Sequence, residues 1–383
     1  MNPKVFPDAE QARIGQDFQR DVCCLFGLPV DNLTLDKTKH LLREKAKLPY
    51  NTVLSTINVN WAVQSFSDPA FRAAIINSDV VTLDGMPLLW LAKLLGYPMT
   101  EVVAGSTLIQ ELNQEKGREK PLSIFFFGGE EEAGRQAVEK VNANKGGLEA
   151  VGRLNPGFGS IEAMSSDAII NAINAPSPDI LLVALGAKKG TRWIEHNRRR
   201  LNAKIISHLG ATINFLAGTV QRAPALASKC GLEWVWRIIQ EPKLFTRYAG
   251  DGLALLRVLL GRLPLWLRYR AWQKHFRLEP ADNTGQWQEN EQTITLSLGR
   301  NLLLTKDSSL RNLFSRAARS GKDLIINFQA TEFVDGACLG LILILAKHQQ
   351  RNGKKLIFHN VQGRLARIFH LFCIPDPYPS EAK

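Results

Sequence analysis

The sequence lacks several features that would place a protein in a class at once. Its five cysteines are odd in number and scattered, with no C-x-x-C pair, which excludes a disulfide framework and a common zinc site and favours a reducing compartment. The first twenty residues contain no apolar core of the kind that a signal peptide has. No uninterrupted apolar run reaches the roughly 18 residues of a membrane span. These absences predict a cytoplasmic protein that is soluble or lies on a membrane surface.

Familiar catalytic motifs are missing as well. The sequence has no G-x-x-x-x-G-K-[ST] loop, and GFGSIE at residues 157–162 lacks the third glycine of a dinucleotide-binding loop. It contains neither H-E-x-x-H nor an Asp-x-Asp pair, and no Ser/His/Asp order stands out. We therefore expect no cofactor and no metal. In particular, we do not expect a site in which a metal ion bound by an Asp-x-Asp pair holds a nucleotide sugar.

What is present begins with length and charge. At 383 residues, 45% hydrophobic and 22% charged, the chain is globular and long enough for two domains. Its net charge of +12 is unevenly placed, because residues 237–277 hold nine Lys or Arg against only Glu241 and Asp251. Such a block predicts an anionic partner, which could be phospholipid, nucleic acid or a phosphorylated substrate.

Strand-like and helix-like patterns alternate from residue 52 to about 210. This spacing of βαβ units predicts an α/β fold with a Rossmann-like parallel sheet covered on both faces. The expected strands are 52–57, 80–83, 122–129, 148–154, 179–186 and 204–210, and the expected helices between them are 68–78, 87–96, 106–117, 130–147, 165–175 and 191–203.

Composition shifts divide the rest of the chain. After Pro224 the pattern is helical, aromatic and basic, then a polar Pro/Gly-bearing stretch precedes a second, smaller α/β pattern. We expect an N-terminal tail (1–24), a core domain (25–225), a helical basic appendage (226–277), a linker (278–290) and a small α/β domain (291–383).

Candidate site residues follow the expected strands, where ligands bind in parallel sheets. Asp84 ends the strand in SDVVTLDG and is about equally a turn former and a functional carboxylate. Thr56, near the end of the preceding strand, is more often a plain β-branched strand residue. The pair Gly128–Gly129 and Gly186 also follow strands. The backbone N–H groups of FFFGGEEEAG could lie near a phosphate, but the three glutamates beside the glycine pair would repel one, so charge alone favours a plain helix start there.

The basic segment contains a periodic stripe. From Pro264, which a helix tolerates in its first turn, a helix would place Leu265, Tyr269, Trp272 and Phe276 on one face and Arg270, Lys274 and Arg277 on the opposite face. Rings at the acyl boundary and cations at head groups suit an interfacial membrane helix. The alternative is a helix that packs on the core with a solvated basic face.

Together the motifs resemble a known family. STINVN, SDVVTLDGMP, FFFGG, PDILLVALGAKK, RAP and GLEWVWRIIQEPKLFTRY, in that order over roughly residues 25–250, resemble the WecG/TagA/CpsF family of bacterial glycosyltransferases (glycosyltransferase family 26). The resemblance implies an inverting, metal-independent transfer from a UDP-sugar to a polyprenyl-diphosphate-linked saccharide at the inner face of the plasma membrane. The enzyme would serve the biosynthesis of a surface polysaccharide.

The resemblance also implies roles for particular residues. Asp84 would be the base and Thr56 its companion, and the reading from the residues agrees, because an inverting transfer needs one carboxylate to accept the acceptor hydroxyl's proton. Cations must hold the leaving diphosphate when no metal does so. The substrate-binding residues would be Asn58, Gly85, Gly128, Gly129, Gly186, Lys189, Arg222, Arg237 and Arg247.

The chain departs from the family pattern at two segments. Val102 and Thr107 stand where the family usually has arginine and aspartate, and Gly190–Thr191 stand where it has Gln-Glu. These departures predict a donor other than the common UDP-N-acetylmannosamine.

The C-terminal segment LIINFQATEFVDGACLGLILILAKHQQRNGKKLIFHNV resembles the STAS domain of sulfate transporters and anti-sigma factor antagonists. Asp335 is followed by Gly336-Ala337-Cys338, so the phosphorylatable serine of switching members is absent. This favours a constitutive module for a protein partner or for self-association. Two alternatives remain: a non-catalytic scaffold that binds a sugar nucleotide and recruits partners through this domain, and an RNA-binding protein, although no RNA module is recognisable.

Overall fold

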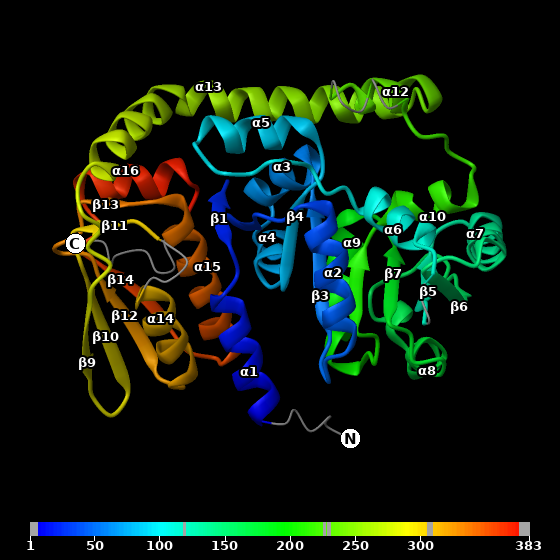
Figure 1. Ribbon diagram of the computed structural model, residues 1–383, viewed down its shortest axis with the longest axis horizontal. Coiled ribbons are helices and arrows are strands. Elements are labelled where there is room, and N and C mark those ends of the chain that lie inside the picture. The colour runs from blue at the N-terminus through cyan, green and yellow to red at the C-terminus, as the bar shows by residue number, and fades with distance from the viewer. Residues whose placement is uncertain (1–6, 118–119, 225–226, 228–230, 305–308, 375–383) are drawn as a thin grey trace. The chain divides into compact units, whose positions relative to one another are not determined.

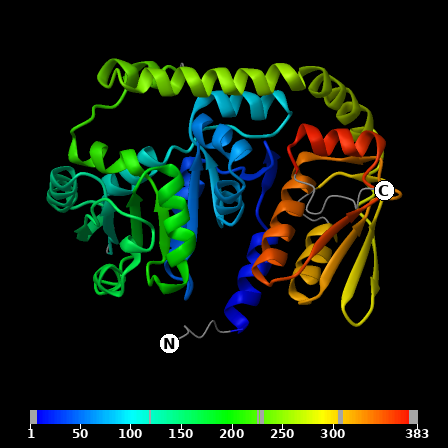
Figure 2. The same cartoon turned by 180° about the vertical axis from the view of Figure 1, so that it is seen from behind.

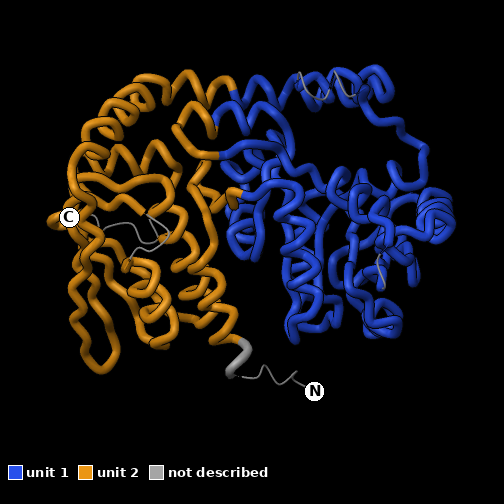
Figure 3. Tube along the Cα trace, in the orientation of Figure 1, with its two compact units in different colours: residues 1–4, 33–91, 99–255 blue, residues 5–32, 92–98, 256–383 orange. Residues whose placement is uncertain are grey.

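The structure is a computed structural model that describes residues 7–117, 120–224, 227, 231–304 and 309–374. The chain divides into two compact units (Figure 3). The described residues of the first unit fall within 33–91 and 99–255, and those of the second fall within 7–32, 92–98 and 256–374.

The first unit is built on a six-stranded parallel sheet with the strand order β4-β3-β8-β7-β5-β6 (Figure 1). The strands are β3 (Thr52–Ile57), β4 (Val80–Leu83), β5 (Leu122–Gly128), β6 (Leu148–Leu154), β7 (Ile180–Ala184) and β8 (Ile205–His208). Their order and direction confirm the α/β class and the six strands predicted from the sequence.

Helices cover both faces of this sheet (Figure 2). Side chains along a strand point alternately to opposite faces, so Ile124 and Phe126 join one apolar cluster while Phe125 and Phe127 join the other. The first cluster includes residues of α2 (Leu35–Ala46), α6 (Gly105–Gln114), α7 (Glu131–Asn144) and α10 (Gly210–Ala217), and the second includes residues of α8 (Asp167–Asn174) and α9 (Ala187–Asn197). Three further helices, α3 (Val59–Ser67), α4 (Pro69–Ile76) and α5 (Met86–Leu94), flank β3 and β4 in the chain.

The second unit contains the C-terminal α/β domain. Its four-stranded sheet has the order β14-β12-β10-β9, with only β9 antiparallel to its neighbour, and a short parallel pair, β11-β13, lies apart from it. The elements are β9 (Gly285–Glu289), β10 (Thr293–Leu298), β11 (Asn301–Leu302), α14 (Ser309–Arg319), β12 (Asp323–Asn327), β13 (Phe333–Val334), α15 (Gly336–Arg351), β14 (Leu356–His359) and α16 (Gly363–Leu371).

The N-terminal segment belongs to this second unit. Residues 1–24 were expected to be a tail, but residues 7–24 include helix α1 (Pro7–Phe18) and most of β1 (Val22–Leu25), which forms a hairpin with β2 (Leu28–Asp31). The hairpin packs closely on α15, since a Cβ at Gly340 would lie 3.0 Å from Cγ2 of Val22. The expectation of a tail is therefore wrong for these residues. The other domain boundaries stay predictions.

The basic segment forms α12 (Glu233–Gln240) and one long helix, α13 (Leu244–Arg277). Pro264 lies inside α13, so the helix expected to begin at Pro264 begins twenty residues earlier. In the second unit, Tyr269 and Phe276 of α13 are buried and stack on Phe333, with ring centroids 5.7 and 5.0 Å apart.

This packing corrects the predicted membrane face. The stripe of Leu265, Tyr269, Trp272 and Phe276 is half-buried or buried, because the aromatic core of the second unit covers it. The alternative of a core-packed helix is thus confirmed for this face. Of the three cations expected opposite, Lys274 and Arg277 are exposed, and Arg270 donates a hydrogen bond to the carbonyl of Leu94 (2.9 Å).

Candidate active site

The carboxyl ends of five parallel strands of the first unit bring the predicted site residues to one edge of its sheet. Asp84 follows β4, Asn58 follows β3, His208 ends β8, Gly186 follows β7 and Gly129 follows β5. Backbone hydrogen bonds tie neighbouring strand ends together: the N–H of Asp84 donates to the carbonyl of Ile57 (2.7 Å), and that of Gly129 donates to Ala184 (2.9 Å). Adjacent strands are about 4.8 Å apart, so the edge from Asp84 to Gly129 spans about 19 Å, enough for an extended ligand.

Asp84 occupies an environment that changes its acidity. The side chain is half-buried. Burial and the negative charge of Glu233 raise its pKa, the backbone N–H of Gly105 and the charges of Arg237 and Arg222 lower it, and the balance is a pKa of about 7. A carboxylate with this pKa can both accept and release a proton near neutral pH, which is what a general base needs.

Two glycines shape the backbone around Asp84. Gly85 has φ +119°, a conformation that L side chains rarely adopt, and it turns the chain from β4 into α5. At Gly105, a Cβ would lie 2.1 Å from Cδ2 of Leu209 and 3.2 Å from Oγ1 of Thr56. The absence of a side chain at Gly105 therefore lets its N–H reach Asp84 beside Thr56, which is 4% exposed. Asp84, Thr56 and Gly85 thus lie together, as the sequence predicted.

Two of the three predicted arginines lie near Asp84. The guanidinium groups of Arg222 and Arg237 both lie over the ring of Phe215, at 5.4 and 5.2 Å from its centroid. Nη1 of Arg222 donates to Oγ1 of Thr107 (3.0 Å). Nε and Nη2 of Arg222 and Nε of Arg237 are buried and have no hydrogen-bond partner among the described residues. Buried donors without partners are costly, so this cluster is suited to an anionic ligand that accepts hydrogen bonds.

The third arginine is placed differently. Arg247 is exposed on α13, and its guanidinium lies over the ring of Tyr248 at 5.1 Å. The structure gives it no contact with Asp84, Arg222 or Arg237. Asn58, also predicted to bind substrate, is the N-cap of α3, because its Oδ1 accepts a hydrogen bond from the N–H of Trp61.

The remaining predicted residues lie along the rest of the edge. Gly128 and Gly129 have φ of +86° and +78°, and a Cβ at Gly128 would lie 2.6 Å from the carbonyl oxygen of Ala184. Gly186, with φ +80°, is the N-cap of α9, and Lys189 is half-buried in the first turn of that helix. Free N–H groups at a helix N-terminus attract phosphate, so these residues could hold the nucleotide part of a ligand.

The departures from the family pattern fall at informative places. Thr107 holds Arg222 through its hydroxyl. The hydroxyl of Thr191 donates to the carbonyl of Ala187 (2.9 Å) and is used inside α9. Gly190 leaves room for a ring, because a Cβ there would lie 2.0 Å from Cδ2 of His208.

Sequence reasoning missed two residues of this edge. Glu233 raises the pKa of Asp84 from a position 149 residues away in the chain, and no spacing rule connects the two. His208 lies at the end of the predicted strand 204–210, so its position at the sheet edge was the signal that could have identified it.

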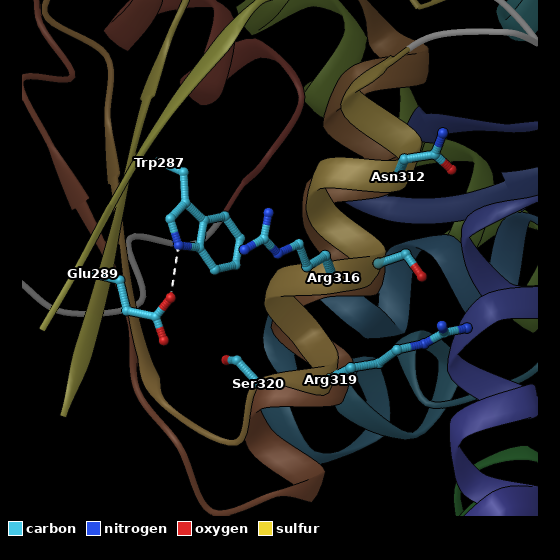
Figure 4. A pocket seen from close by; sticks show the side chains of 7 residues that line it. Trp287, Glu289, Asn312, Arg316, Arg319 and Ser320 are labelled. Atoms are coloured by element: carbon cyan, nitrogen blue, oxygen red, sulfur yellow. Dashed lines mark hydrogen bonds between the residues drawn. The ribbon is translucent and has the colours of Figure 1, made fainter. Parts of the chain in front are cut away.

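A separate surface hollow lies in the second unit. It has a volume of about 400 Å³ and is lined by residues of β9 and α14 (Figure 4). Arg316 lies over the ring of Trp287 at 4.2 Å, and the indole N–H of Trp287 donates to Glu289 (2.8 Å). Arg316, Trp287 and Glu289 of this hollow thus already contact one another. The site residues predicted from the sequence do not line it.

Two family models and several curated proteins match the chain. The model of the Glycosyl transferase WecG/TagA/CpsF family matches residues 23–268, and that of the STAS domain matches residues 286–376. The chain is similar to the N-acetylglucosaminyldiphosphoundecaprenol N-acetyl-beta-D-mannosaminyltransferase of Bacillus spizizenii, with 26% identity over 192 residues, 50% of this chain and 72% of the relative. It is also similar to the protein of the same name from Bacillus subtilis, with 26% identity over 226 residues, 58% of this chain and 82% of the relative. Both resemblances drawn from the sequence are confirmed.

Among the helices that the structure describes, none is long and apolar enough to span a bilayer.

Proposed function

The chain belongs to the WecG/TagA/CpsF family of glycosyltransferases, and on that premise we propose that it moves a sugar from a UDP-sugar to a polyprenyl-diphosphate-linked saccharide. The transfer would be inverting and independent of a metal, and it would serve the biosynthesis of a surface polysaccharide. The observation that carries the proposal is Asp84, a carboxylate with a pKa of about 7 beside two arginines that each have at least one buried donor without a hydrogen-bond partner among the described residues.

The chemistry follows from the charges. Asp84 removes the proton from the acceptor hydroxyl as that oxygen attacks the anomeric carbon of the donor, and the bond from that carbon to the diphosphate breaks. Attack from the face opposite the leaving group inverts the anomeric centre. The diphosphate leaves with added negative charge, and the free donors of Arg222 and Arg237 would stabilise it. Thr107 would orient Arg222 for this role.

The printed names of the two relatives supply the acceptor class. Both relatives act on an N-acetylglucosaminyl-diphosphoundecaprenol. We extend only the diphosphate-polyprenol part to this chain, because Thr107 and Gly190 differ from the family pattern and the sugars stay open. A lipid-linked acceptor requires the enzyme to work at a membrane surface.

The membrane contact would use a different face of α13 from the one first predicted. Leu256, Leu260, Leu263 and Leu267 lie on one stripe of this helix and are each between 45% and 66% exposed. Two exposed cations, Arg257 and Arg268, lie along one side of the stripe, and the exposed Lys274 lies in line with it two turns beyond Leu267. The helix has a single acid, Asp251, whose carboxylate accepts hydrogen bonds from Asn60 (3.0 and 3.1 Å). An apolar stripe with cations along one side and beyond its end suits an anionic lipid surface.

The STAS domain would dock onto its own chain. Tyr97 donates a hydrogen bond from its hydroxyl to the carbonyl of Cys24 (2.6 Å) and lies against Gly336, where a Cβ would be 1.8 Å from its oxygen. Asp335 is used as the N-cap of α15, since it accepts from the N–H of Cys338 (2.7 Å). We therefore propose an intramolecular role for this loop in place of recruitment of another protein.

The test is a panel of UDP-sugars with a synthetic polyprenyl-diphosphate-linked acceptor. We expect transfer with at least one donor, and Asp84→Asn should lower turnover about 100-fold or more while UDP binding and thermal stability are retained. Near-normal transfer by the Asn variant would make Asp84 a turn residue only. UDP binding without transfer or hydrolysis for every donor would favour the scaffold alternative.

A further inference from the structure

His208 is a buried residue at the centre of the sheet edge that the mechanism above does not use. It ends β8, pairs in register with Val183 of β7, and is only 8% exposed. On its other side β8 pairs with β3, the strand that carries Thr56. His208 is therefore two strands from Asp84, about 10 Å along the edge.

The ring of His208 has a prepared position. A Cβ at Gly190 would lie 2.0 Å from its Cδ2, so only glycine in the first turn of α9 leaves room for the ring. The ring centroid is 5.8 Å from that of Trp61 in α3, and a Cβ at Gly210, the first residue of α10, would lie 3.7 Å from Cε1. The first turns of three helices thus hold the imidazole in one place.

One ring nitrogen lacks a partner. Nε2 is buried and has no hydrogen-bond partner among the described residues. Burial lowers the pKa of His208 to about 4, although a hydrogen bond to its own backbone raises it. The imidazole is therefore neutral near pH 7. Nδ1 is the ring nitrogen nearest the residue's own backbone, so we assign the backbone hydrogen bond and the ring proton to Nδ1, which leaves a lone pair on Nε2.

We propose that His208 is a ligand-binding residue of the transferase site, whose Nε2 accepts a hydrogen bond from an O–H or N–H group of the nucleotide part of the sugar donor. A neutral acceptor cannot bind a phosphate oxygen, which carries no proton at neutral pH, so the partner is a ribose hydroxyl or the imide N–H of a pyrimidine base. This inference rests on the proposed function. It adds that the site favours nucleotides with a group that can donate a hydrogen bond to Nε2 of His208. Gly190 is its companion, since it admits the ring.

The experiment measures UDP binding by isothermal titration calorimetry to the full chain and to His208→Phe. Phenylalanine keeps a ring in the pocket and removes the lone pair. We expect binding to weaken about 3- to 10-fold, the usual effect of one hydrogen bond. The matched control is His196→Phe, at an exposed histidine of α9, which should bind UDP as the parent does. Thermal denaturation of each variant shows whether it is folded.

Further arms distinguish the donor group and the possible failures. If the parent and His208→Phe bind 2′-deoxy-UDP or 3′-deoxy-UDP with equal affinity, the missing ribose hydroxyl is the group that donates to Nε2. If they bind N3-methyl-UDP with equal affinity, the donor is the imide N–H of the base. Equal UDP binding by the parent and a folded His208→Phe overturns the inference and leaves the proposed function standing. If the parent binds no uridine nucleotide, the proposed function fails, and the inference fails with it.

Discussion

Carboxylates of the first unit differ in whether neighbouring residues already supply the hydrogen bonds and the positive charge that stabilise their ionised form. Asp79 is buried, pairs with Arg198 and accepts a hydrogen bond from the N–H of Val53 (2.8 Å). Asp179 accepts from both the N–H and the hydroxyl of Ser123 (2.9 Å each). Both of these residues directly precede strands, at the amino ends of β4 and β7, whereas Asp84 follows the carboxyl end of β4, where burial and the charge of Glu233 disfavour its ionised form. Asp79 and Asp179 therefore stabilise the fold, whereas Asp84 has a raised pKa and can accept a proton near neutral pH.

The pKa of Asp84 leads to a prediction about pH. Its carboxyl is protonated below about pH 7 and cannot act as a base there, so kcat/KM should rise as pH increases through about 7 and then level off. Glu233→Gln removes a negative charge that raises this pKa, and the rise should then move to lower pH. Transfer rates measured between pH 5.5 and 8.5 test both points. A flat profile in the parent, or no shift in the variant, would contradict the assignment of the base.

The sequence predicted the six strands of the first unit well because their signals are local, but it gave no helix for α2, α3 or α10. Buried strands such as β5 and β7 are continuous apolar runs, and α4 begins at Asp68-Pro69, where the Asp68 carboxylate accepts from the N–H of Phe71 (3.0 Å). Helix α13 shows the limit. Its period is clear, but it has apolar residues on two faces, and only the surface packed against it decides which face is buried. The face with Tyr269 and Phe276, which the sequence predicted to contact the membrane, packs against the aromatic core around Phe333.

The exposed leucine stripe of α13 gives a prediction at the scale of this element. We expect the protein to co-sediment with anionic vesicles, to bind neutral vesicles much less, and to be released by high salt, since each cation near an anionic surface contributes about 1 kcal/mol. Changing Arg257, Arg268 and Lys274 to Glu together should abolish co-sedimentation. So should changing Leu256, Leu260, Leu263 and Leu267 to Ser together.

A control with the same charge change separates a local contact from general attraction. Lys116, Lys145 and Arg199 are exposed cations of the first unit, and changing all three to Glu alters the net charge equally. This variant should still sediment with anionic vesicles. If both triple variants behave alike, the attraction depends on net charge alone and α13 is not the contact.

At the scale of the whole molecule, the two units are assembled from segments far apart in the chain. Residues 7–32 and 92–98 join the C-terminal domain to make the second unit. Arg311 of α14 donates to the carbonyl of Phe18, the last residue of α1 (2.7 Å), and to that of Arg20 just past it (2.8 Å). No local pattern in the first thirty residues could indicate this, because the contacts join residues nearly 300 positions apart. The sequence therefore predicted the domain's family while missing what completes its core.

A buried charge cluster makes the role of α1 testable. Lys347 of α15 is fully buried, and its ammonium donates to Oδ2 of Asp17 (2.8 Å), as does Nε2 of His348 when it carries a proton (2.9 Å). Burial raises the pKa of Asp17, but the charge of Lys347, the hydrogen bond with His348 and the charge of Arg20 outweigh it, and the pKa lies well below its usual value. A carboxyl with a depressed pKa contributes stability above the unfolded-state pKa of about 3.9, and that contribution is lost as pH falls.

Asp17→Asn removes the carboxylate that pairs with the buried ammonium of Lys347, so we expect the free energy of unfolding of the second unit to fall by about 3–5 kcal/mol at pH 7. The matched control is Asp36→Asn, whose carboxylate pairs with Lys39 at the surface and is 89% exposed, and it should cost less than about 1 kcal/mol. Urea unfolding at pH 7 and pH 4 measures both. The difference between parent and Asp17→Asn should begin to shrink at pH 4, because the carboxyl of the unfolded parent takes up a proton near its pKa of about 3.9 while the folded parent stays ionised. Equal stability of parent and Asp17→Asn at pH 7 would mean that α1 is not held to α15 through this pair, and that the N-terminal segment contributes to the second unit through apolar packing alone.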